Sequence, residues 1–111
     1  MASLLAAAVT ATRSDARLIW VPPETVLAAG IAPWIELPIW LPPDGEGAGL
    51  HSGDVSAVYA AGLNCRPVEE TVADTWAWLQ REGDPPAAPG RPAHGLDAGR
   101  EREVLAGLAR S

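Results

Sequence analysis

Residues 54–82 read DVSAVYAAGLNCRPVEETVADTWAWLQRE, and this stretch decides the fold. Its second half begins at Pro67, and proline is favoured where a helix starts because its missing N–H needs no partner there. Two glutamates follow in the first turn, where they suit the positive end of the helix dipole. The pattern predicts a helix over Val68 to Gln80. Its apolar side chains recur at helical spacing, at Val68, Val72, Trp76 and Leu79.

The first half of the same stretch predicts a shorter helix and then a brief strand. Asp54 can cap the helix, because its carboxylate can accept hydrogen bonds from free N–H groups at the helix start. Gly62 is suited to end it, since glycine tolerates the left-handed conformation that follows many helices. Residues 63–66 (LNCR) then predict a short extended strand.

Upstream, an alanine-rich segment predicts a helix over residues 2–12, because alanine has the highest helix propensity. Residues 17–21 (RLIWV) are mostly apolar and are stopped by two prolines, which is typical of a buried strand. Pro23 also suits the first position of a short helix that Gly30 ends. The whole pattern predicts an α/β fold: a small, mainly helical domain with two short strands. The first helix has an apolar face that needs a partner, formed by Leu4, Leu5, Ala8 and Val9.

Two segments rich in proline divide the chain. Residues 31–43 contain four prolines and two tryptophans. The prolines exclude a helix and a central strand, so we expect this segment to run extended. Residues 83–95 contain four prolines and three glycines with almost no large apolar side chain, which predicts a flexible linker. Asp97 can then cap a last helix. We therefore expect a domain over residues 1–82, the linker over 83–95 and a C-terminal helix within 96–111.

Composition narrows the class of function. The net charge is −6 and no basic stripe is present, which argues against nucleic acid as a partner. The single cysteine, Cys65, cannot form an internal disulfide and fits a reducing compartment. No apolar run is long enough to span a membrane, and residues 1–12 lack the basic start of a signal peptide. We expect a cytoplasmic protein without a membrane partner.

The order of motifs in residues 54–78 resembles the tail of the extended short-chain dehydrogenases/reductases, of the NAD-dependent epimerase/dehydratase type. In that family a helix beginning Asp-Val-Ser leads to Gly-Leu, a strand ending Arg-Pro and a helix ending Thr-x-x-Trp, as in this chain. Residues 15–22 and 33–42 are similar to the strand and the proline-rich loop of a reductase-like branch, and residues 95–103 to its terminal helix.

The resemblance implies the C-terminal, substrate-binding part of such a protein, without the Rossmann half that binds NAD(P) in the family. The family's Tyr-x-x-x-Lys pair cannot occur, because the chain has no lysine and Leu63 stands four positions after Tyr59. The glycines of residues 45–53 do not fit the spacing Gly-x-Gly-x-x-Gly. We expect no catalytic residue, no cofactor-binding residue and no cofactor for this chain alone, and leave open whether it is an enzyme. No metal site is expected either, since histidine, cysteine and carboxylates lack metal-ligand spacing.

The substrate pocket of the resembled family lies between this part and the Rossmann half. Trp34, Glu36 and Trp40 are candidates to line it, and the other interpretation of these tryptophans is that they cover the local core. Tyr59 is expected in the core, or in the pocket if the chain acts alone.

Two functions remain open. The first is the substrate-binding or lid portion of an NAD(P)-dependent reductase or epimerase, either as a truncated reading frame or as a remnant that needs a partner. The alternative is a free-standing protein that binds a small ligand, or a cofactor-independent isomerase or cyclase derived from the same tail. The partners expected are a small-molecule substrate, together with a Rossmann domain or a second copy of the chain.

Overall fold

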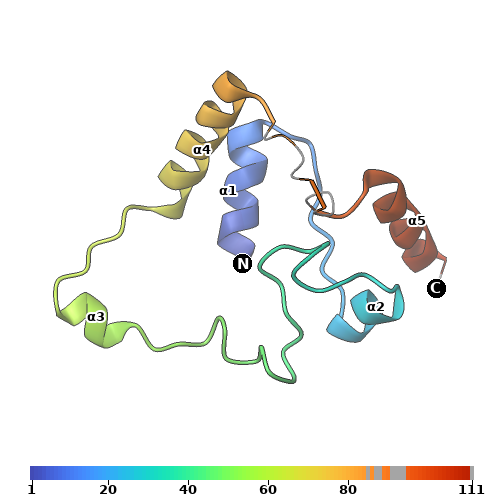
Figure 1. Cartoon of the computed structure of the whole chain (residues 1–111), viewed down its shortest axis with the longest axis horizontal. Helices are drawn as coiled ribbons and strands as arrows, with labels where there is room; N and C mark the ends of the chain where they lie inside the picture. Colours follow the sequence, from blue (N-terminus) through green and yellow to red (C-terminus); the bar gives the residue numbers. More distant parts are fainter. Residues whose placement is uncertain (85, 87–88, 91–94, 111) are drawn as a thin grey trace. The chain divides into compact units, whose positions relative to one another are not determined.

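The computed structural model describes residues 1–84, 86, 89–90 and 95–110. These residues form two compact units, unit 1 (residues 1–19 and 54–86) and unit 2 (residues 20–53 and 87–111). The helices along the chain are α1 (Ala2–Thr12), α2 (Pro23–Ala28), α3 (Ser56–Ala60), α4 (Val68–Glu82) and α5 (Ala98–Ala109) (Figure 1).

Unit 1 is built on α1 and α4, which lie side by side (Figure 1). The predicted bounds of α1 are confirmed, and α4 continues two residues beyond its predicted end at Gln80. Ala7 of α1 is only 6% exposed, whereas Leu4 and Leu5 are half-buried. Ala7 is therefore the buried residue of α1, whereas the predicted apolar face of this helix is only partly covered.

The short helix α3 also belongs to unit 1. The carboxylate of Asp54 accepts a hydrogen bond from the backbone N–H of Ser56 at 2.9 Å, and this bond lowers the pKa of Asp54. Gly62 follows the helix with φ +102°, a conformation that glycine adopts without steric cost. Gly62 therefore ends the helix as predicted, whereas Asp54 lies one residue before the N-cap position, which Val55 occupies. All residues of α3 are exposed.

Unit 2 contains α2 and α5, and both helices begin where the sequence predicts. Pro23 occupies the first turn of α2. The side chain of Asp97 accepts hydrogen bonds from the backbone N–H groups of Gly99 and Arg100 at 2.9 and 3.0 Å. Such a cap contributes about 1 kcal/mol to helix stability. Among the described residues of unit 2, the buried one is Ile31, at 6% exposure.

The two predicted strands are wrong. The described residues are mainly helical and contain no strand, only an isolated bridge between Pro33 and Leu37. Residues 17–21 and 63–66 have no sheet partner within the described part of the chain. β-propensity reflects packing on a pleated surface, so an apolar run without a second strand beside it cannot form a sheet. Leu18, Ile19 and Trp20 are left exposed instead, and Trp20 is 63% exposed.

The predicted linker over residues 83–95 lies largely outside the described residues, at 85, 87–88 and 91–94. The flexibility of this linker stays a prediction. So does the division of the chain into a domain over residues 1–82, the linker and a C-terminal helix within 96–111. Among the described residues, no helix has the length and hydropathy needed to cross a membrane.

Large apolar side chains are exposed in both units. Unit 1 exposes Leu18, Ile19 and Val58, and unit 2 exposes Trp20, Leu27 and Trp34.

Candidate functional site

Residues 32–40, which we call the tryptophan loop, fold into successive tight turns. The N–H of Trp34 donates to the carbonyl of Trp40 at 3.0 Å, and the N–H of Glu36 donates to the carbonyl of Ala32 at 3.0 Å. The expectation that residues 31–43 run extended is therefore wrong. Proline excludes helix and central strand, as predicted, but its fixed φ also suits turns, and the intervening N–H groups close them.

The loop holds two residues in an unusual backbone conformation. Trp34 and Ile39 have φ values of 66° and 67°, in the left-handed region that bulky side chains rarely adopt. Such residues cost of order 1–3 kcal/mol each and persist where the surroundings fix them. The ring Nε2 of His51 lies 2.6 Å from the carbonyl oxygen of Ile39, and the backbone of Trp34 is held by Trp40. A further contact therefore holds the backbone at each of the two residues with a left-handed conformation, Trp34 and Ile39.

The loop presents an apolar surface to solvent. Trp34 and Ile35 are 53% and 52% exposed, and Ile39 is also exposed. Trp40 and Glu36 are half-buried. Trp34 and the two isoleucines are thus exposed, whereas Trp40 is half-buried. The interpretation that the tryptophans cover the core therefore fits Trp40 better than Trp34.

Glu36 is engaged within unit 2. Its Oε2 accepts a hydrogen bond from the backbone N–H of Ala32 at 2.6 Å. Its Oε1 lies 3.6 Å from Nε of Arg100 on α5. A carboxylate that is satisfied in this way holds the loop together, so a structural role accounts for Glu36 without a ligand.

Tyr59 does not belong to the tryptophan loop. It lies on α3 in unit 1, whereas Trp34, Glu36 and Trp40 lie in unit 2. Its side chain is exposed, so the expectation that it lies in a core is wrong. Hydrogen bonding with the side chain of Cys65 raises the pKa of Tyr59, and the charge of the thiolate adds to this effect. The structure brings together three of the four predicted site residues.

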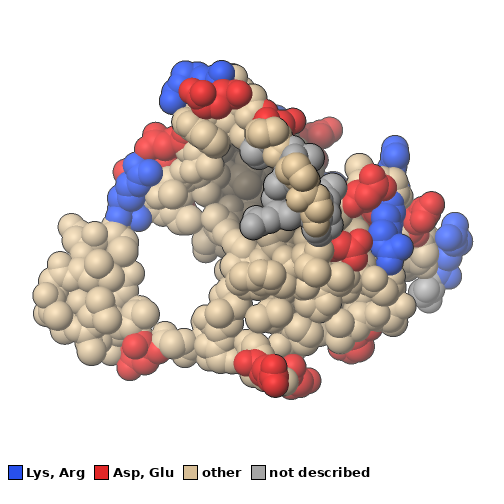
Figure 2. Space-filling view, viewed as in Figure 1, with Lys and Arg blue, Asp and Glu red and all other residues tan. Residues whose placement is uncertain are grey.

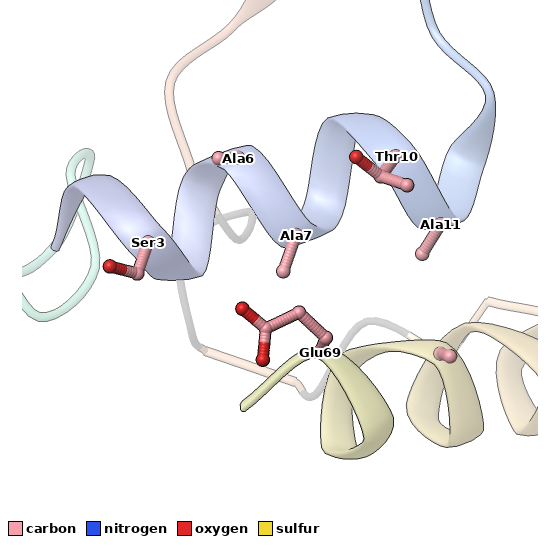
Figure 3. Close-up of a pocket in the computed structure, with 7 residues that line it drawn as sticks. Ser3, Ala6, Ala7, Thr10, Ala11 and Glu69 are labelled. Carbon is pink, nitrogen blue, oxygen red and sulfur yellow. The ribbon is translucent and has the colours of Figure 1, made fainter. Parts of the chain in front are cut away.

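A groove in unit 1 was not predicted. It has a volume of about 560 Å³, and Figure 3 shows it between α1 and α4, with the carboxylate of Glu69 lying between the two helices. The sequence signal for this groove is the run of small residues that recur along α1. Reading α1 by its leucines alone misses this signal. The groove is lined by Ser3, Ala6, Ala7, Thr10, Ala11, Glu69 and Ala73.

Comparison of the chain with protein-family models, with curated proteins and with solved structures finds no match. The functional argument therefore depends on the residues and their geometry. In the described part of the chain, no group of three or more histidine, cysteine or carboxylate side chains is placed to hold a metal ion. The tryptophan loop exposes the apolar side chains of Trp34, Ile35 and Ile39 to solvent.

Proposed function

We propose that the chain is the substrate-binding part of an NAD(P)-dependent reductase or epimerase of the extended short-chain dehydrogenase type. A nucleotide-binding Rossmann segment, in the same polypeptide or in a partner, supplies the cofactor and the Tyr-x-x-x-Lys pair. The order of motifs over residues 54–78 supports this assignment. The chain has no lysine, so the proposed redox step needs residues from elsewhere.

The tryptophan loop is the observation that carries the proposal. An aromatic surface that is exposed on a fixed backbone binds a ligand with little further loss of conformational entropy. Trp34 and Ile35 are exposed in this way, and the carboxylate of Glu36 is already paired with the N–H of Ala32 and with Arg100. The face offered to the ligand is therefore apolar. We expect the substrate to present an apolar portion to this loop.

Unit 1 carries the surface proposed for the nucleotide-binding segment. Residues 55–65 contain no charged side chain, and Figure 2 shows an uncharged surface over α3. Val55, Val58 and Leu63 are exposed. Exposed apolar side chains that are grouped on one segment are typical of an interaction site. A protein evolved to act alone would cover such residues or replace them by polar ones, so their exposure favours this proposal over the free-standing alternative.

The isolated chain should not bind NADPH at micromolar concentration, because it has neither the glycine fingerprint nor a strand leading into one. Its five tryptophans provide the signal. In a fluorescence titration with NADPH, quenching should follow only the absorbance of the cofactor, as it does for N-acetyltryptophanamide measured in parallel. Saturable quenching beyond that control would show a cofactor site in this chain and would contradict the division of labour proposed here.

A further inference from the structure

Arg100, in the first turn of α5, contacts residues that lie far earlier in the chain. Its Nη2 donates hydrogen bonds to the carbonyl oxygens of Ala29 and Gly30, each at 3.0 Å. These carbonyls follow the last turn of α2. A guanidinium is well placed there, because helix C-terminal carbonyls lack partners and carry partial negative charge.

The backbone at Gly30 makes room for this contact. Gly30 has φ +68°, and a Cβ added there would lie 3.3 Å from Nη2 of Arg100. A side chain at this position would therefore be strained in its backbone and would crowd the guanidinium. Glycine both ends α2 and admits Arg100.

The other side of the guanidinium faces the tryptophan loop. Nε of Arg100 is buried and has no hydrogen-bond partner among the described residues, and Oε1 of Glu36 lies 3.6 Å away. This distance is beyond a hydrogen bond but within an ion pair. Glu36 in turn accepts from the N–H of Ala32, where the loop begins. One guanidinium thus connects α5 both to the residues before the loop and to the carboxylate inside it.

We infer that Arg100 is a positioning residue for the tryptophan loop. It contacts the carbonyls of Ala29 and Gly30 and the carboxylate of Glu36, and these contacts fix the backbone conformation of the loop that carries Trp34. The C-terminal helix therefore sets the conformation of the proposed ligand surface. The role in ligand binding rests on the proposed function. The effect on the loop does not, and it can be measured without cofactor or substrate.

The test is ¹⁹F NMR of the chain labelled with 5-fluorotryptophan, in which single Trp→Phe variants assign the signals. In Arg100→Gln the signals of Trp34 and Trp40 should shift or broaden well below the unfolding temperature, while Trp76 and Trp78 of unit 1 stay unchanged. The substitution removes the hydrogen bonds that the charged guanidinium donates to the carbonyls of Ala29 and Gly30. The loop should then open more often, so exchange of the amide hydrogens of Trp34 and Ala32 should accelerate about tenfold or more. A residue that only stabilised unit 2 would lower the unfolding temperature without changing these native signals.

Three further variants make the result decisive. Arg102→Gln, the same change on an exposed position of α5, should leave the loop signals unchanged. Arg100→Lys keeps the charge and should restore them in part, and it replaces Arg100→Gln if that variant fails to fold. Glu36→Gln should alter the same signals, and the double variant should add little to either single change. Unchanged loop signals in Arg100→Gln and Arg100→Lys, or equal changes in Arg102→Gln, would overturn the inference.

Discussion

Replacing Ile31 by alanine should strongly destabilise unit 2. Ile31 is 6% exposed and is the buried large apolar side chain in the described part of this unit. Truncating a buried isoleucine costs about 2–4 kcal/mol, from lost burial and from the cavity left behind. A small domain has only about 5–15 kcal/mol of stability in total, and a unit with so little core lies at the low end. Urea unfolding followed by tryptophan fluorescence should show the midpoint falling sharply.

Ile35→Ala is the matched control, because the same side chain is removed four residues away. Ile35 is 52% exposed, so its truncation should change stability by less than about 0.5 kcal/mol. Equal shifts of the urea midpoint for the two variants would show that Ile31 is no more buried in solution than Ile35. The description of unit 2 would then be incorrect.

The chain studied alone should self-associate at tens of micromolar. Its exposed apolar residues occur in both units, and without a covering partner they reduce their contact with water by meeting those of another copy. Sedimentation velocity should detect dimers or soluble aggregates. Trp34→Glu should shift the distribution toward monomer, because a charge then lies in the most exposed part of the tryptophan loop.

Gln80→Glu adds the same charge at an exposed polar position of α4 and should leave the association unchanged. A wild-type chain that sediments as a monomer, unfolds cooperatively on heating and binds no dye for exposed apolar surface would contradict this prediction. It would support the free-standing alternative.

The helices could be predicted because their signals are local. Pro23 and Asp97 mark helix starts through chemistry that involves only the next few residues, and the periodicity of α4 extends over its whole length. The strands could not be predicted in this way. Residues 17–21 have the composition of a strand, but a strand also needs a neighbour that local sequence does not specify.

The position of the tryptophan loop could be predicted from the sequence, but its geometry could not. The prolines and tryptophans mark the loop, whereas the left-handed conformations of Trp34 and Ile39 have no sequence signal, since neither residue is glycine. The contact of Arg100 with Ala29 spans 71 positions and follows no local pattern. Residue type alone groups Tyr59 with the loop residues, whereas the structure places it in the other unit.

The proposed division of labour is tested most directly by the composition of the protein as it occurs in its own cells. Native purification, followed by intact-mass measurement and tryptic peptide sequencing, identifies the particle that contains this sequence. We predict a particle heavier than 11.6 kDa in which a Gly-x-Gly-x-x-Gly fingerprint and a Tyr-x-x-x-Lys pair occur, in the same polypeptide or in a bound one. A free monomer of 11.6 kDa, or a particle that contains only copies of this chain, would contradict the proposal.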